Sequence, residues 1–205
     1  ILSGLVGSEM CIRDSWSDLP PEQITEESQA NLRATLEAAV AAGFHHIETA
    51  RHYGSSERQL GWLLQQVPDP DRILQTKVPP QADPDAFEAE LATSFERLGV
   101  ERIDLLGIHG VNLPEHLEHT LRPGGCLEVA QRWQSDGRIG SIGFSTHGSL
   151  ELIEEAIASD AFDYVNLHWY FIRQDNSPAI ERAIRHDMGV FVISPTDKGG
   201  HLHSP

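Results

Sequence analysis

The chain has 205 residues, 15 basic and 31 acidic side chains, a formal net charge of −16 and 40% hydrophobic residues. At about 150 residues per domain, this length favours a single domain with one sizeable core. The acidic balance argues against nucleic-acid or anionic-membrane partners, because the mean field repels phosphates. No apolar run approaches the roughly 18 residues of a membrane span. Two cysteines, Cys11 and Cys126, are too few for a disulfide framework or a four-cysteine cluster, which fits a reducing compartment and predicts a cytoplasmic protein.

The two ends of the chain differ from its body. Residues 1–15 have no basic start before their short apolar stretch and follow neither a helix nor a strand period, so they make a poor signal peptide. We expect this segment to be non-native and the domain to span residues 16–205. The last residues, SPTDKGGHLHSP, follow a strand-like run and contain a glycine-rich stretch that should lead into another element. We therefore expect a truncated domain.

Helical and strand-like segments alternate along the body. In the first helix Leu32, Leu36 and Val40 recur every four residues, and Gly43 supplies a C-terminal stop. The predicted helices cover residues 26–42, 56–67, 84–98, 125–135, 150–159 and 178–186. The predicted strands cover residues 44–50, 73–78, 103–109, 141–146, 164–170 and 190–194. Strands separated by helices of this length indicate βαβ units and a parallel sheet.

Two folds agree with this alternation: an open doubly wound sheet and a closed (β/α)₈ barrel. The nucleotide-binding fingerprint G-x-G-x-x-G is absent, since Gly137, Gly140 and Gly143 are spaced G-x-x-G-x-x-G. The barrel makes the sharper prediction, because its chemistry lies at the C-terminal ends of several strands.

Ionisable residues stand at three successive strand ends. Glu48 lies near the end of the first predicted strand, Lys77 near the end of the second and His109 at the end of the third. Tyr53 follows Glu48 by five residues, in a loop that can reach the same rim. The two-residue alternation of strands places three further residues on the same interior face, namely His46, Gln75 and Gly107.

Each of these residues also has a purely structural interpretation. Lys77 and Glu48 could form a rim salt bridge, His109 could be a core histidine, and Tyr53 could be a packing aromatic residue. Together they suit proton transfer to a carbonyl oxygen. A neighbouring ammonium lowers the tyrosine pKa from about 10, a carboxylate holds that ammonium in place, and a histidine donates to the same oxygen. A hydride would have to come from a cofactor.

Several spaced motifs resemble the aldo/keto reductase family. The stretch GFHHIETARHYGSSERQLGWLL is similar to the family's Asp-Thr-Ala…Tyr-Gly…Ser-Glu…Leu-Gly signature. ILQTKV resembles its lysine strand, SFERLGVERIDLLGIHG its Leu-Gly…Asp-Leu…His block, and GRIGSIGFSTH the segment that ends near the nicotinamide. The resemblance runs from about residue 26 to residue 198. NLHWYF and ISPTDKGG resemble the subgroup that often carries a ferredoxin-like C-terminal extension.

This resemblance implies an α/β TIM barrel that binds NADP(H) without a Rossmann domain and reduces aldehydes or ketones to alcohols. Tyr53 falls at the position of the general acid, Lys77 at that of its activating lysine and His109 at that of the substrate-orienting histidine. Glu48 stands where the family usually has aspartate, so its longer side chain displaces the carboxylate. About strands 2 to 7 of the eight are visible, so the barrel is expected to be incomplete.

The resemblance also suggests cofactor contacts. Ser145 and Thr146 stand where the family commonly has Ser-Asn beside the carboxamide, and Asn166 stands near its glutamine. Ser194 is expected to join them, and Ile193 replaces an aromatic ring that many members stack on the nicotinamide. The structural alternative for Ser145 and Asn166 is capping of backbone groups at strand ends. Because the missing late loops hold the adenosine and its 2′-phosphate in the family, we expect this 205-residue chain to bind NADP(H) poorly.

Two rival functions remain at this stage. Lys77 could act as a Schiff-base nucleophile of an aldolase-type barrel. Alternatively, the protein could bind the cofactor without catalysis and report redox state to a partner, since fold does not guarantee activity. No metal site is predicted: His116 and His119 lack a third convergent ligand and are assigned to a solvated polar loop, and His201 and His203 lie near the tail. The expected partner is a small carbonyl compound, and the sequence leaves the oligomeric state open.

Overall fold

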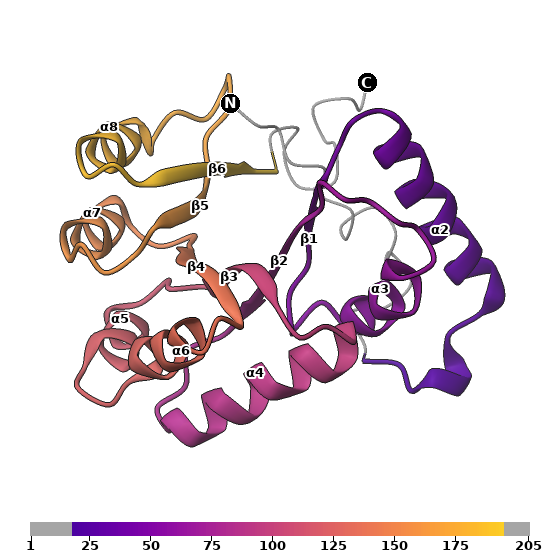
Figure 1. Cartoon of the computed structure of the whole chain (residues 1–205). Helices are drawn as coiled ribbons and strands as arrows, with labels where there is room; N and C mark the ends of the chain where they lie inside the picture. Colours follow the sequence, from indigo (N-terminus) through magenta and orange to yellow (C-terminus); the bar gives the residue numbers. More distant parts are fainter. Residues whose placement is uncertain (1–17, 195–205) are drawn as a thin grey trace.

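The computed structural model describes residues 18–194, which form one parallel sheet covered by helices (Figure 1). The six strands follow one another in the sheet in chain order, with every neighbouring pair parallel. Their bounds are β1 His46–Glu48, β2 Ile73–Val78, β3 Ile103–Ile108, β4 Ile139–Ser145, β5 Tyr164–His168 and β6 Gly189–Ile193. Because the strand order never reverses, the sheet lacks the switch point of a doubly wound fold, which leaves the barrel.

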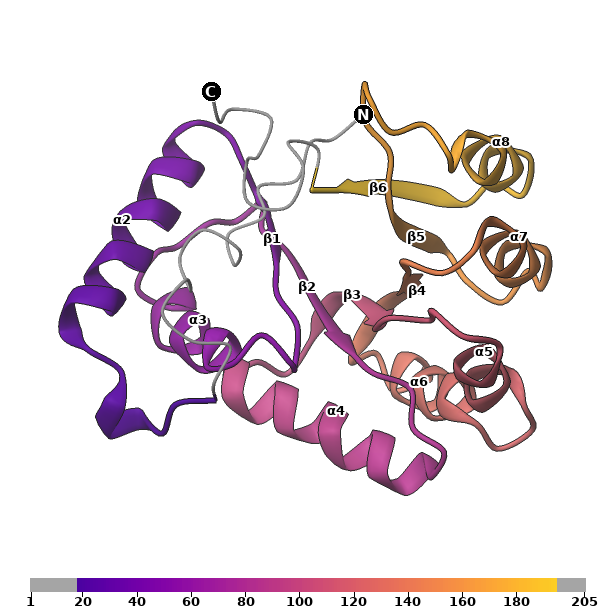
Figure 2. The same cartoon turned by 180° about the vertical axis from the view of Figure 1, so that it is seen from behind.

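The helices lie outside the curve of the sheet, as Figure 2 shows from behind. A short 3₁₀ turn, η1 Pro21–Gln23, precedes them. Their bounds are α2 Glu26–Ala41, α3 Ser56–Leu64, α4 Pro84–Leu98, α5 Pro114–Leu121, α6 Cys126–Ser135, α7 Leu150–Ala158 and α8 Ser177–Arg185. Within residues 18–194, no helix has the length and apolar character needed to cross a bilayer.

Side-chain contacts across the concave face show how strongly the sheet curls. The rings of His46 on β1 and Phe191 on β6 lie 5.0 Å apart between centroids, although four strands separate them in the sheet. Asn166 on β5 contacts Glu48 on β1 at 2.8 Å. The described strands therefore form a half-barrel, and the prediction of an incomplete (β/α)₈ barrel is confirmed.

Helix α4 illustrates how local sequence sets an element. The Asp83 side chain accepts the Asp85 N–H at its start, Pro84 occupies the first turn, and Gly99 ends it with a φ of 64°. Its apolar stripe is buried against the sheet and neighbouring helices and comprises Phe87, Leu91, Phe95 and Leu98. The predicted helix over residues 84–98 is confirmed.

Glycines lie beside two large side chains in one row of the sheet interior. The paired residues in this row are Lys77, Gly107, Gly143, Tyr164 and Gly189. A Cβ at Gly107 would lie 2.8 Å from Lys77 Cγ, and one at Gly143 would lie 2.5 Å from Tyr164 Cγ. The glycines therefore provide the space in which the lysine and tyrosine side chains lie.

Two predictions about elements are corrected. The segment assigned to a polar loop around His116 and His119 is helix α5, because Pro114 starts it and the buried Leu117 and Thr120 anchor it. Strands β1 and β5 end two residues earlier than predicted, and β3, β4 and β6 end one residue earlier. Beyond the end of β1 the chain still runs beside β2, since the Arg51 N–H donates to the Lys77 carbonyl.

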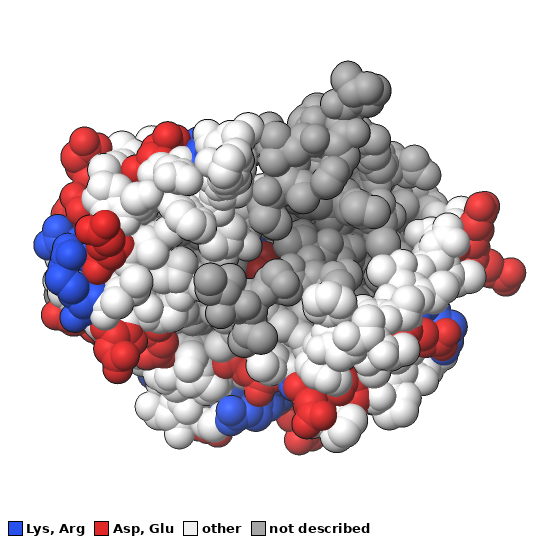
Figure 3. All heavy atoms as spheres, turned by 90° about the horizontal axis from the view of Figure 1, so that it is seen from above, with Lys and Arg blue, Asp and Glu red and all other residues white. Residues whose placement is uncertain are grey.

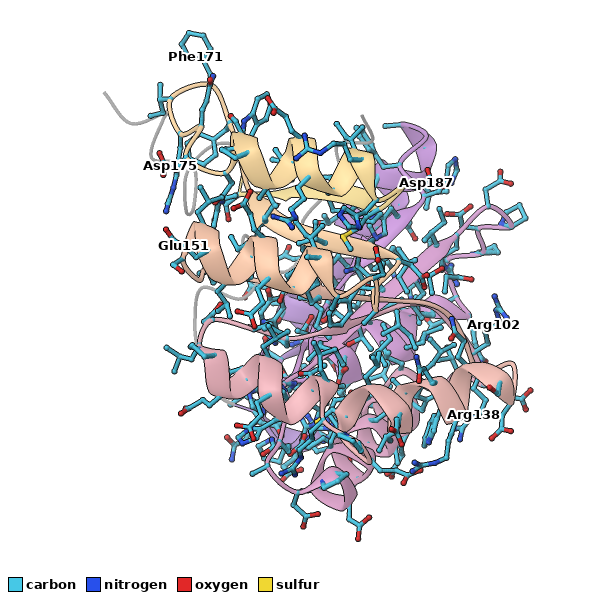
Figure 4. All side chains as sticks on the ribbon, turned by 90° about the vertical axis from the view of Figure 1, so that its left-hand side faces the viewer. Arg102, Arg138, Glu151, Phe171, Asp175 and Asp187 are labelled. Carbon is cyan, nitrogen blue, oxygen red and sulfur yellow. The ribbon has the colours of Figure 1, made fainter. Side chains whose placement is uncertain are left out.

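Charged side chains lie mainly around the outline of the face in Figure 3, with acidic and basic groups interspersed. In the side view of Figure 4, Phe171 extends from the segment between β5 and α8, away from the body of the protein, and it is 89% exposed. The expectations for residues 1–15 and for His201 and His203 concern segments outside residues 18–194.

Candidate active site

A buried ion pair joins the first two strands at the C-terminal end of the sheet. Lys77 Nζ lies 2.5 Å from Glu48 Oε1 and donates a second hydrogen bond to the Thr49 carbonyl at 3.0 Å. Lys77 is 1% exposed and Glu48 8%. The predicted pairing of these two residues is therefore present, and the longer glutamate side chain reaches the ammonium directly.

Tyr53 lies beside this pair, in the loop between β1 and α3. Its ring centroid is 4.8 Å from Lys77 Nζ. Backbone hydrogen bonds fix the loop, because Tyr53 N–H donates to the Ala50 carbonyl and Ser56 N–H donates to the Tyr53 carbonyl, each at 3.0 Å. The hydroxyls of Thr49 and Ser56 are 2.8 Å apart and tie the loop's two ends together.

His109 completes the group from the end of β3. Its ring meets that of Tyr53 edge to face, with centroids 5.5 Å apart, and its backbone N–H donates to the Val78 carbonyl at 2.8 Å. Burial and the nearby charge of Lys77 lower the pKa of His109 to about 3. The imidazole is therefore neutral at physiological pH and has one N–H to donate.

Opposing effects act on the Lys77 ammonium. Burial alone lowers the pKa of Lys77, but the Glu48 charge and interactions with Tyr53 raise it by more, and the net direction is upward. Lys77 therefore stays protonated at neutral pH. A protonated lysine beside a phenol stabilises the phenolate that forms when the phenol gives up its proton.

A second layer of polar side chains lies beneath Glu48. Asn166 Nδ2 donates to Glu48 Oε2 at 2.8 Å, and Gln75 Nε2 donates to Asn166 Oδ1 at 3.1 Å. Gln75 Oε1 is 2.9 Å from His46 Nε2. Strand alternation predicted that His46 and Gln75 face the interior, but the contact of Gln75 with Asn166 on β5 had no signal in the sequence.

The residues predicted to contact a cofactor lie at the end of β4, within β5 and directly after β6. Ser145 Oγ accepts the Gly110 N–H at 3.0 Å. Thr146 Oγ1 donates to the Val111 carbonyl at 2.7 Å and accepts the Gly148 N–H at 2.9 Å. The Ser145 contact is the backbone capping of the structural alternative, whereas the Asn166 side chain contacts the side chains of Glu48 and Gln75. Cofactor binding by Ser145, Thr146, Asn166 and Ser194 stays a prediction.

One cluster of potential metal ligands occurs in residues 18–194, away from these strand ends. His45, Asp69 and Asp71 bring their ligand atoms within 4.8 Å of one another. His45 Nδ1 lies 2.9 Å from Asp69 Oδ1, which also accepts the Asp71 N–H. These internal contacts account for the cluster without an ion.

Comparison with known proteins assigns the family. The model of the aldo/keto reductase family matches residues 14–203. The chain belongs to the aldo/keto reductase family. The aldo-keto reductase str7 of Strobilurus tenacellus is 36% identical over 125 residues, which cover 58% of this chain and 35% of that protein. D-threo-aldose 1-dehydrogenase of a Pseudomonas species is 30% identical over 144 residues, 55% of this chain and 43% of that protein.

Solved structures of aldo-keto reductases share the fold of this family member. The thermostable aldo-keto reductase Tm1743 has a TM-score of 0.74 at 22% identity, covering 96% of this chain and 69% of that one. A Bombyx mori aldo-keto reductase in complex with NADP has a TM-score of 0.68 at 19% identity, covering 95% of this chain and 63% of that one. The predicted family is thus confirmed, and the chain spans less than half the length of the two curated relatives above.

Proposed function

We propose that this aldo/keto reductase reduces an aldehyde or ketone to an alcohol, with NADPH as the reductant and Tyr53 as the general acid. The observation that carries the proposal is the convergence of Tyr53, Lys77, Glu48 and His109 at one end of the sheet. These residues come from three successive strand ends and one loop, which is where barrel enzymes place their chemistry.

Proton donation is the task of Tyr53 in this proposal. The phenol gives its proton to the carbonyl oxygen as that oxygen gains negative charge, and the phenolate left behind faces the Lys77 ammonium. Glu48 keeps Lys77 charged and fixes its position through the 2.5 Å contact. The Lys77 ammonium stabilises the ionised form of Tyr53. A free tyrosine has no such partner, and its pKa near 10 keeps it protonated at neutral pH.

His109 is suited to orient the substrate. With a pKa of about 3 it is neutral, so it offers a hydrogen bond to the carbonyl oxygen without placing a second full positive charge beside Lys77. Its edge-to-face contact with Tyr53 places both rings on one side of the site. Tyr53 and His109 can therefore approach the same oxygen atom.

The cofactor assignment rests on the family and on the chemistry of the strand ends. The Bombyx mori relative was crystallised with NADP. When bound, the cofactor supplies the hydride that no side chain can provide. The Ser145 hydroxyl accepts one backbone hydrogen bond and retains its own O–H as a donor, which suits a carboxamide oxygen. Ser145, Thr146, Asn166 and Ser194 are the residues we propose to lie nearest the nicotinamide.

The site favours reduction over Schiff-base chemistry. An amine nucleophile must be unprotonated, whereas Glu48 and Tyr53 raise the pKa of Lys77. Among the relatives, a D-threo-aldose 1-dehydrogenase and a mouse aflatoxin B1 aldehyde reductase bear names of carbonyl chemistry. The substrate class proposed here is accordingly a small aldehyde or ketone. We place this reaction in the cytoplasm, with which the buried free thiol of Cys126 agrees.

Replacement of the phenol hydroxyl tests the assignment. We expect Tyr53→Phe to abolish NADPH-dependent reduction of a panel of aldehydes and ketones while leaving NADPH affinity nearly unchanged, because the ring stays in place and only the proton donor is lost. Turnover is followed by NADPH absorbance and affinity by calorimetry. Full turnover in this variant would refute the role of Tyr53. Tight NADPH binding by the parent protein without reduction of any carbonyl would favour the non-catalytic alternative.

A further inference from the structure

The Glu48 carboxylate is held from two sides by residues on different strands. Oε1 faces Lys77 Nζ at 2.5 Å, and Oε2 accepts the Asn166 amide N–H at 2.8 Å. Lys77 belongs to the strand next to β1, but Asn166 belongs to β5, on the other side of the barrel interior. Asn166 is 0% exposed. A contact of this kind fixes the rotation of a carboxylate that a lysine alone would leave free to turn.

The orientation of the Asn166 amide is set by a chain of buried groups. Gln75 Nε2 donates to Asn166 Oδ1 at 3.1 Å, which turns Asn166 Nδ2 toward Glu48. The Gln75 amide is oriented in turn by His46, whose Nε2 lies 2.9 Å from Gln75 Oε1. An amide oxygen can only accept, so His46 Nε2 is the donor. Burial lowers the pKa of His46, in agreement with a neutral ring.

The lengths of the two side chains match the distance they span. Glu48 has two methylene groups and Asn166 one, and together they bridge β1 and β5. Aspartate at position 48 would draw the carboxylate back toward β1 and leave Asn166 short of it. Lys77 could follow such a movement, because its Nζ already lies against the Thr49 carbonyl beside β1. The contact that depends on the length of Glu48 is therefore the one with Asn166.

We propose that Asn166 and Gln75 are positioning residues that hold the Glu48 carboxylate against Lys77, with Glu48 and Asn166 acting as a length-matched pair. The catalytic role of this pair rests on the proposed function. The effect of the pair on the Lys77 pKa, however, can be measured without turnover. The ionisable groups that face this network are Glu48, Lys77, Tyr53, His109, His46 and Tyr164, whose hydroxyl accepts a hydrogen bond from Gln75 Nε2 at 3.4 Å.

The composition of the chain makes the test specific. Its sequence contains two lysines, Lys77 and Lys198, so protein labelled with ¹³C and ¹⁵N in lysine gives two side-chain signals, and Lys198→Arg leaves one. In this background we expect Lys77 not to titrate below pH 10.5, its ordinary value. In Asn166→Leu we expect the midpoint to fall by about one pH unit or more, because the carboxylate loses a donor and turns away. We expect Gln75→Leu also to lower the Lys77 titration midpoint, but by less than Asn166→Leu does.

A matched control removes a partly buried amide elsewhere. Gln134 Nε2 donates to the Gly140 carbonyl at 2.9 Å, at the opposite end of β4 from Ser145. Gln134→Leu should leave the Lys77 midpoint where it is. An unchanged midpoint in folded Asn166→Leu, or an equal shift in Gln134→Leu, would overturn the proposal.

A compensating swap keeps the proposal testable if Asn166→Leu does not fold. Glu48→Asp alone should lower the Lys77 midpoint, and adding Asn166→Gln should restore at least half of that shift, because one methylene moves from one partner to the other. If the double variant titrates no higher than Glu48→Asp, the length-matched pair is refuted. In turnover at saturating NADPH, Asn166→Leu should reduce kcat with little change in the KM for the carbonyl substrate. A failed Tyr53→Phe test would remove the proposed function and leave the titration result standing.

Discussion

Each face of strand β2 contacts a buried carboxyl group, and the two groups have different partners. On the inner face, Lys77 pairs with Glu48 at 2.5 Å. On the outer face, the adjacent Thr76 donates to Glu57 Oε1 at 2.6 Å, and Glu57 is 1% exposed at the start of α3. Burial raises the pKa of Glu57, against smaller lowering contributions from Thr76 and Ser94.

The two carboxyl groups therefore differ in their partners, since Glu48 faces an ammonium and Glu57 faces a hydroxyl. Glu57 is more easily protonated than an ordinary glutamate, so its contact with Thr76 joins helix to sheet without requiring an ion pair. Glu48 faces an ammonium that stays protonated. Two neighbouring residues of β2 thus have different roles. Thr76 contacts helix α3 on the outer face, and Lys77 places a positive charge in the barrel interior.

The largest effect should follow from breaking the inner ion pair. Lys77→Met leaves the buried Glu48 carboxylate without its cation, and we expect the free energy of unfolding to fall by about 3 kcal/mol. Urea denaturation at pH 7 measures this loss. The double variant Lys77→Met/Glu48→Gln should recover most of it, since no unpaired charge remains. A single variant as stable as the parent protein would show that the pair does not set the stability of the inner face.

The space around the lysine stem provides the next test. Gly107→Ala places a Cβ 2.8 Å from Lys77 Cγ, close to the backbone end of that side chain, and we expect a loss of about 1 to 3 kcal/mol in the free energy of unfolding. The matched control is Gly189→Ala, in the same row of the sheet, where the nearest atom would be Tyr164 Cβ at 3.2 Å. Equal losses in the two variants would contradict a specific conflict with Lys77.

His109 tests the inner face by its response to acid. Its pKa is about 3 in the folded protein and about 6.5 in the unfolded chain, so the unfolded state takes up the proton first. Stability from the neutral ring is complete above pH 6.5 and is lost as the pH falls toward 3. We expect the free energy of unfolding to fall by about 1 kcal/mol more between pH 7.0 and 5.5 in the parent protein than in His109→Gln. His119→Gln, on the outer helix α5, serves as the control.

The smallest effect is expected on the outer face. A carboxyl whose pKa is raised by folding stabilises the protein fully below its unfolded pKa, and that stability is lost as the pH rises through the folded value. Glu57→Gln keeps the acceptor for Thr76 and removes the charge, so we expect stability at pH 7 to rise by a few tenths of a kcal/mol or stay the same. Thermal unfolding at pH 5 and pH 7 measures this change. A large destabilisation at pH 7 would show that Glu57 works as an anion.

Local patterns predicted most of the elements and the main site residues. Four-residue spacing located α2 and α4, and alternation along β1 and β2 placed Glu48 and Lys77 on one face. Both rules need only the chain near each residue, which explains why they succeeded. The same rules put His116 and His119 in a loop, because their polar character outweighed the apolar positions of Leu117 and Leu121 that mark α5.

Contacts across the barrel were beyond prediction from the sequence. Glu48 and Asn166 are 118 positions apart, and no local period links them. The glutamate in place of the family's aspartate suggested a displaced carboxylate. In the structure, the Glu48 carboxylate accepts hydrogen bonds from Lys77 and from Asn166. Only the curl of the sheet, which brings β1 against β5, reveals a partner for each oxygen.

The order of the strands and of the helices other than α5, the polar residues at the strand ends and the family signature follow from the amino-acid sequence alone, because each depends on neighbouring residues or on fixed spacing. The tertiary structure decided which of those residues meet. Lys77 keeps its proton, His109 loses its own and Asn166 reaches Glu48 because closing the sheet removes water and brings distant strands within hydrogen-bond distance.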